Sequence, residues 1–159
     1  MNIYDYAMQM EKDSEYYYRQ LAGNCDDTGL KTILNMLADE EVKHYHILDK
    51  MKSEKPEMPP SEVLAKAKNI FAGMKKVVAL SCATSQIDLY KKAQELEKKA
   101  EEFYRQKAGE EQGQVQKELL LKIAQEESRH YLLLENIIQF VSRPQEWLEN
   151  AEWHHLEEY

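Results

Sequence analysis

The chain is poor in the residues that build turns and disulfides. It has five glycines and four prolines in 159 residues, which leaves little room for a turn-rich β architecture. Its two cysteines, Cys25 and Cys82, lie far apart in the sequence. They form no CxxC pair, and two cysteines so placed do not indicate a disulfide framework.

Basic charge and long apolar runs are also scarce. The formal net charge is −8 and no basic stripe is present, which argues against nucleic acid as a partner. No apolar run approaches the roughly 20 residues that a membrane span needs. The N-terminal stretch has neither the basic nor the apolar region of a signal peptide. We therefore expect a cytoplasmic protein with no nucleic-acid or membrane partner.

What the sequence does contain is helical periodicity, and no segment alternates with a period of two. We therefore predict an all-α fold and a single domain, residues 1–159. Asp27 or Thr28 is expected to cap the helix that follows the break at 23–29. The predicted long helices span about 3–22, 29–53, 86–108 and 114–141, and shorter ones span about 61–80 and 142–159.

The order of these helices predicts a ferritin-like four-helix bundle. Two helical hairpins, 3–53 and 86–141, are joined by a connection of some 30 residues, 54–85, which carries a helix of its own. One long crossover between the second and third long helices is a known bundle topology.

The two hairpins are an internal repeat. With a shift of 86 residues, EKDSEYYYRQLAG (11–23) aligns with EKKAEEFYRQKAG (97–109), and ADEEVKHY (38–45) aligns with AQEESRHY (124–131). Over 4–51 against 90–137, 18 of 48 positions are identical. The bundle should therefore have a pseudo-two-fold axis that presents each repeated polar residue twice.

Repeated polar residues interrupt the apolar seam of every long helix. On the second and fourth helices the seam is apolar except for one Glu and one His, three residues apart, and each of the other two helices has one seam Glu. These six residues are Glu11, Glu41, His44, Glu97, Glu127 and His130.

Such a set calls for a cation. Four buried carboxylates would repel one another, two divalent metals would offset their charge, and two neutral imidazoles would add nitrogen donors. The mixed oxygen and nitrogen set suits iron, manganese or zinc, and this pattern of Glu and Glu-x-x-His is typical of di-metal carboxylate bundles. The alternative is a structural or interaction bundle whose buried Glu–His pairs hold no metal.

Four further repeated residues are candidates for an outer shell around this site. Glu40 and Glu126 lie near the edge of the apolar face, four residues before each His, so they are candidate ligands or outer-shell carboxylates. Tyr18 and Tyr104 are expected to be core aromatics whose hydroxyls need a partner, and a ligand carboxylate is one candidate for that partner.

These residues resemble the rubrerythrin family of ferritin-like di-iron proteins, over about 3–51 and 86–141. The resemblance implies that Glu11 and Glu97 each bind metal, that Glu41 and Glu127 bridge two iron ions, and that His44 and His130 each bind one. It also implies a non-haem oxidoreductase that reacts with hydrogen peroxide or O2 as its irons cycle between the ferrous and ferric states.

The chain departs from that family in two respects. Full-length rubrerythrins carry a four-cysteine rubredoxin module, so the resemblance implies a separate, rubredoxin-like electron donor. Many also carry a further ligand Glu three residues after the third-helix Glu, where this chain has Ala100. That difference supports the alternative of a ferritin-like protein that oxidises and handles iron. The crossover and the C-terminal segment are candidate surfaces for covering the bundle or forming a homodimer.

Overall fold

Four long helices make up most of the structure, a computed structural model that describes residues 3–52, 63, 65–67, 70 and 86–142. No strand occurs in these residues, so the predicted all-α class is confirmed. The helices are α1 (Ile3–Gly23), α2 (Thr28–Met51), α5 (Ile87–Glu110) and α6 (Gln114–Ser142).

Parts of the sequence prediction fall on residues that the structure does not describe. Residues 63, 65–67 and 70 are helical and agree with the helix expected over about 61–80. The rest of that crossover helix and the C-terminal helix expected over 142–159 lie outside the described residues, apart from the last residue of α6, so they stay predictions.

A side-chain cap defines the start of α2. Asp27 has an extended backbone conformation, and its carboxylate accepts a hydrogen bond of 2.9 Å from the backbone N–H of Leu30. Such a cap satisfies one of the N–H groups that the first turn of a helix leaves unpaired. The turn between α1 and α2 is therefore short and well defined, as the sequence indicated.

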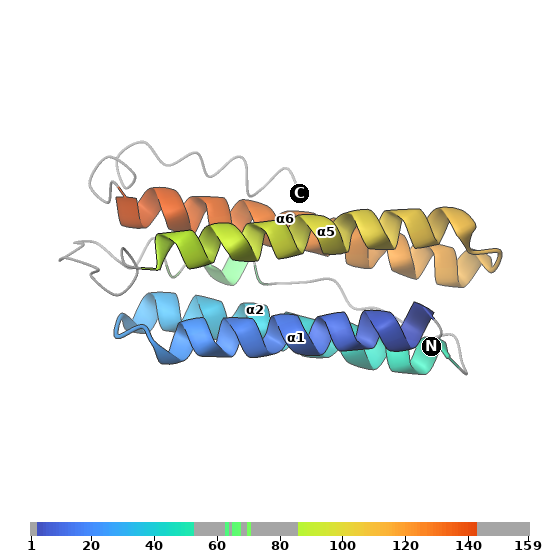
Figure 1. The fold of residues 1–159 in the computed structure, drawn as a ribbon, viewed down its shortest axis with the longest axis horizontal. Helices are drawn as coiled ribbons and strands as arrows, with labels where there is room; N and C mark the ends of the chain where they lie inside the picture. The colour runs from blue at the N-terminus through green and yellow to red at the C-terminus, as the bar shows by residue number, and fades with distance from the viewer. Residues whose placement is uncertain (1–2, 53–62, 64, 68–69, 71–85, 143–159) are drawn as a thin grey trace.

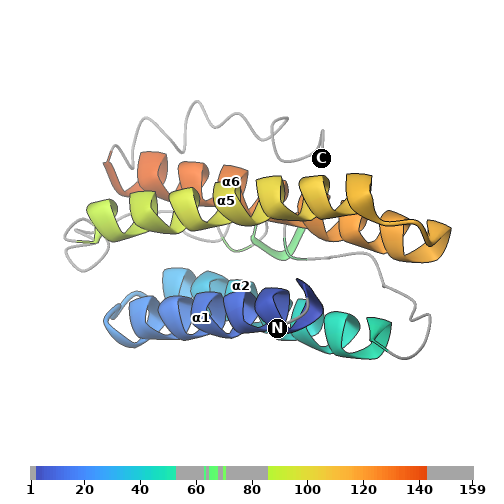
Figure 2. The ribbon, with the colours of Figure 1, turned by 45° about the vertical axis from the view of Figure 1, so that its right-hand side comes forward.

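The helices are arranged as two layers of two. Figure 1 shows α1 beside α2 in one layer and α5 beside α6 in the other, and the view in Figure 2 agrees. Each helix packs chiefly against the other helix of its hairpin, and contacts between the hairpins run from α1 to α5 and from α2 to α6. The crossover of 52–86 joins the two layers, as expected for a ferritin-like bundle.

Two apolar clusters fill the bundle on either side of its middle. One includes Leu34 and Leu134, and the other includes Leu48 and Leu120. Leu34 and Leu120 are equivalent in the repeat, as are Leu48 and Leu134, so the pseudo-two-fold relation exchanges one cluster for the other. The polar seam residues therefore lie between two dry regions. In the described part of the chain, no helix is long and apolar enough to cross a membrane.

Candidate metal centre

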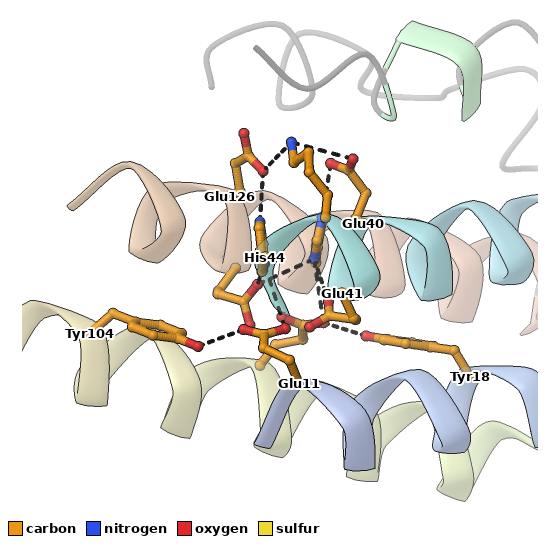
Figure 3. Close-up of polar contacts among 11 residues, drawn as sticks. Glu11, Tyr18, Glu40, Glu41, His44, Tyr104 and Glu126 are labelled. Carbon is orange, nitrogen blue, oxygen red and sulfur yellow. Dashed lines mark hydrogen bonds and ion pairs between the residues drawn. The ribbon is translucent and has the colours of Figure 1, made fainter. Parts of the chain in front are cut away.

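The fold brings all six seam residues into one cluster (Figure 3). They come from all four long helices, and their ligand atoms form two overlapping groups, within each of which the atoms lie within 4.8 Å of one another. The first group is Glu11, Glu41, His44 and Glu127, and the second is Glu41, Glu97, Glu127 and His130.

Glu41 and Glu127 belong to both groups, and each group adds one His and one further Glu. This is the arrangement needed if the two shared carboxylates bridge a pair of ions. The rings of His44 and His130 are stacked, with centroids 6.0 Å apart and an interplanar angle of 17°. The repeat therefore produces two similar metal-binding positions side by side.

The residues fit a pair of cations because many of their buried polar atoms make no hydrogen bond among the described residues and face one another, with Nδ1 of His44 3.0 Å from Glu127 and Nδ1 of His130 3.2 Å from Glu41. All six side chains are at most 2% exposed, and buried polar atoms in proteins are normally hydrogen-bonded. Yet, within the described part of the chain, both carboxylate oxygens of Glu41 and Nδ1 of His44 and of His130 make no hydrogen bond. One carboxylate oxygen of Glu11, of Glu97 and of Glu127 also makes no hydrogen bond there. These atoms are available as ligands.

Two tyrosines link the hairpins through the carboxylates that are not shared. The Tyr18 hydroxyl on α1 donates to Glu97 on α5 at 2.5 Å, and the Tyr104 hydroxyl on α5 donates to Glu11 on α1 at 2.6 Å. Figure 3 shows the two phenols approaching the cluster from opposite sides. Burial raises the pKa of each phenol well above 10, and the charge of its Glu partner raises it further. Both phenols therefore stay protonated and act as donors.

The outer nitrogens of the two histidines face Glu126 and Glu40. The Nε2 atom of His44 lies 2.8 Å from Glu126 Oε1 and forms a hydrogen bond, whereas Nε2 of His130 lies 3.7 Å from Glu40 Oε1. Glu126 is buried, which raises its pKa, but the contacts with His44 and Lys43 together outweigh burial and keep this pKa below the ordinary value. Both glutamates thus lie behind the histidines, on the side away from the shared carboxylates.

Sequence reasoning missed Lys43, whose ammonium lies between these two outer carboxylates. Its Nζ is 2.9 Å from Glu126 and 3.4 Å from Glu40. The available signal was the i, i+3 spacing from Glu40 together with Arg129, a cation at the equivalent position of the repeat. By contrast, the repeated Glu15 and Glu101 pair with arginines on their own helices and contribute nothing to the cluster.

The shared carboxyl groups resist ionisation when no cation is bound. Burial raises the pKa of Glu41 well above its ordinary value of 4.5, and the charges of Glu11 and Glu127 raise it further. Burial likewise raises the pKa of Glu127, with the charges of Glu97 and Glu11 adding to the effect. Two of the four carboxyls thus hold protons in the metal-free protein at pH values where an exposed Glu is ionised.

The histidines also hold protons in the metal-free protein. Burial by itself would lower the pKa of His44, but the contacts with Glu11, Glu126 and Glu127 together outweigh it and raise this pKa well above 6.5. The contacts with Glu97, Glu40 and Glu41 together do the same for His130. Because a metal ligand must be an ionised carboxylate or a neutral imidazole, a metal ion must displace these protons.

Metal affinity is therefore expected to fall as the pH is lowered from about 8 to about 6. Protons compete with the ion at groups whose pKa is raised, and each displaced proton makes the affinity change by up to about tenfold per pH unit. Calorimetric titration of the metal-free protein with Zn²⁺, in buffers of different ionisation enthalpy, measures both the affinity and the number of protons released. An affinity independent of pH, with no proton release, would show that these groups do not bind the ion.

Comparison with known proteins agrees with this geometry. A family model described as Rubrerythrin matches residues 2–138, which is most of the chain and contains all six residues of the cluster. No curated protein and no solved structure gives a match.

Proposed function

The chain belongs to the rubrerythrin family, and on that basis we propose that it is a di-iron oxidoreductase that reacts with hydrogen peroxide or O2. The observation that carries this proposal is the pair of overlapping, fully buried ligand groups that share Glu41 and Glu127. Two iron ions fit this set, and manganese or zinc fits the same oxygen and nitrogen donors. The electrons would come from a separate, rubredoxin-like donor.

Each part of the cluster has a role in this proposal. When two irons are bound, they supply the electrons that reduce the oxidant. The four carboxylates offset the charge of the ions, and His44 and His130 each hold one ion through Nδ1, the ring nitrogen that faces the cluster. The two apolar clusters on either side keep bulk water away from the site.

The tyrosines orient the two carboxylates that belong to only one group each. A carboxylate that accepts a hydrogen bond through one oxygen has its other oxygen directed elsewhere. In Glu11 and Glu97 the oxygen that the tyrosine does not bond is Oε2, which is buried and makes no hydrogen bond within the described residues. Each phenol thus positions one carboxylate and leaves an oxygen free for a metal ion.

A ferritin-like protein that oxidises and handles iron is the second candidate. The observation in its favour is Ala100, which is buried in the apolar cluster of Leu48 and Leu120. A methyl group stands there in place of the further ligand Glu that many rubrerythrins carry. A metal-free interaction bundle is the least favoured reading, because it would leave buried carboxylate oxygens, such as Oε2 of Glu41 and of Glu97, without a hydrogen bond among the described residues.

Two assays of the iron-loaded protein separate the candidates. An oxidoreductase is expected to turn over hydrogen peroxide for many cycles with reduced rubredoxin as the donor. An iron-handling protein is expected to oxidise added Fe(II) and retain the product, without sustained use of peroxide. Glu97→Gln should abolish either activity, and Glu101→Gln, one turn further along α5 and paired with Arg105, should not. Absence of both activities in iron-loaded wild-type protein would refute the proposed function.

A further inference from the structure

A single lysine joins the outer sides of both histidines. Lys43 on α2 contacts Glu126 of α6 at 2.9 Å and Glu40 of its own helix at 3.4 Å. The oxygen of Glu126 that accepts from Lys43 also accepts from Nε2 of His44 at 2.8 Å. The other oxygen of Glu40 faces Nε2 of His130. We call this set of contacts, His44–Glu126–Lys43–Glu40–His130, the outer arc; Figure 3 shows its two glutamates, Glu126 and Glu40, at the top, on the side away from Glu11.

The two halves of the outer arc are not equivalent. Nε2 of His44 donates a hydrogen bond to Glu126, whereas Nε2 of His130 is buried, lies 3.7 Å from Glu40 and makes no hydrogen bond within the described residues. The inner six residues repeat in identity, although their contacts differ in detail, and the outer contacts differ more strongly. The pseudo-two-fold symmetry of the site is therefore broken in its outer contacts.

The repeats also differ at the position of Lys43, where the second repeat has Arg129. The ammonium of Lys43 reaches both outer carboxylates, and it lies closer to Glu126 than to Glu40. The equivalent Arg129 makes no matching contact, and its buried Nε has no hydrogen-bond partner in the described part of the chain. Among the contacts of the described residues, Lys43 is the cation that contacts both outer carboxylates, and it holds Glu126 against His44. The side chain of Glu126 is 6% exposed and that of Glu40 is 15% exposed, so the first contact is also better shielded from water.

We propose that Lys43 makes the two metal positions unequal, so that an ion binds more tightly beside His44 than beside His130. This inference rests on the proposed function, because it requires that the cluster binds metal. An outer hydrogen bond fixes the tautomer and orientation of a ligand imidazole and typically changes metal affinity by about 10–100-fold. His44 has such a bond through a carboxylate that Lys43 positions. His130 lacks such a bond among the described residues, so forming one when an ion binds would cost free energy and weaken binding beside His130.

Partial loading tests the proposal without any measurement of activity. Metal-free protein is given one equivalent of Co²⁺ per chain and crystallised, and anomalous difference maps give the occupancy beside each histidine. Wild-type protein is expected to show at least several-fold higher occupancy beside His44. Equal occupancies, or a preference for His130, would overturn the proposal. No ion at either position, even with excess Co²⁺, would instead refute the metal centre itself.

Two sets of matched variants, one of the outer glutamates and one of the cations, test the cause of the inequality. Glu126→Ala should lower the occupancy beside His44, and Glu40→Ala should leave it unchanged. Lys43→Met should bring the ratio of occupancies towards one, Lys43→Arg should retain the inequality, and Arg129→Met should not alter the ratio. The ratio of the two occupancies is informative because loss of the Lys43 charge affects binding at both metal positions, whereas loss of the Glu126 orientation affects only the position beside His44. Glu126→Gln, which keeps an acceptor, is the substitute if Glu126→Ala does not fold, and it should give an intermediate ratio. A ratio that Lys43→Met leaves intact would refute the role of Lys43.

Discussion

Loading with a divalent metal is expected to raise the melting temperature of the protein by roughly 5–10 °C for each position filled at about 100 times its dissociation constant. An ion that binds only the folded state contributes about 2.7 kcal/mol at that concentration. For a chain of this size, each kcal/mol shifts the melting temperature by about 2–4 °C. Scanning calorimetry of the metal-free and Zn²⁺-loaded protein at pH 7 measures the difference.

Tight binding is expected because a cation brings positive charge and ligand bonds to a buried cluster that otherwise depends on bound protons and Glu–His contacts. The four carboxylates and two histidines are almost completely buried, and buried charges are costly without a partner. A bound cation supplies the partner and the missing ligand bonds at once. If the site were instead a network of satisfied Glu–His hydrogen bonds, metal would leave the melting temperature unchanged. A variant with both His44 and His130 replaced by Ala is the control, and its melting temperature should not respond to Zn²⁺.

Replacement of either shared carboxyl group is expected to reduce the metal content from about two ions per chain to fewer than one. Glu127 offers ligand atoms to both groups, so Glu127→Gln removes an anionic ligand from both positions. Because the pKa of Glu127 is raised by burial and by the charges of Glu97 and Glu11, a neutral amide is close to its state in the metal-free protein. Elemental analysis after reconstitution and desalting measures the loss.

The same variant separates loss of metal from loss of fold. Metal-free Glu127→Gln should melt at or above the temperature of metal-free wild-type protein, because the amide, like the protonated carboxyl group, is neutral and has nearly the same volume. Glu118→Gln, on the exposed part of the same helix, is the matched control and should keep the full metal content. Glu127→Gln protein that still binds about two ions per chain would contradict the assignment of Glu127 as a shared ligand.

The sequence was sufficient to predict the fold and the inner cluster because both follow from repetition along single helices. The seam spacing places Glu41 and His44 on one buried face, and the shift of 86 residues duplicates them as Glu127 and His130. The Asp27 cap was likewise a local signal that the structure confirms. The two sets of residues meet because the two hairpins pack against each other in the bundle.

The outer contacts, apart from that of Lys43 with Glu40, were not predictable in the same way because they join residues from different hairpins. Nothing in the sequence near His44 indicates that its outer partner is Glu126, 82 residues away. From the sequence, a ligand carboxylate was only one candidate partner for the hydroxyls of Tyr18 and Tyr104. The structure shows that each hydroxyl donates to a Glu of the opposite hairpin. The reach of Lys43 from α2 to α6 depends on the distance between helices, which periodicity does not specify.

The most direct test of the metal centre is the metal content of wild-type protein purified without chelator and then reconstituted with Fe(II). We expect about two ions per chain, and crystals measured at the iron absorption edge should place one ion beside His44 and one beside His130, with Glu41 and Glu127 between them. Fewer than one ion per chain after reconstitution, or ions located away from these residues, would contradict the account.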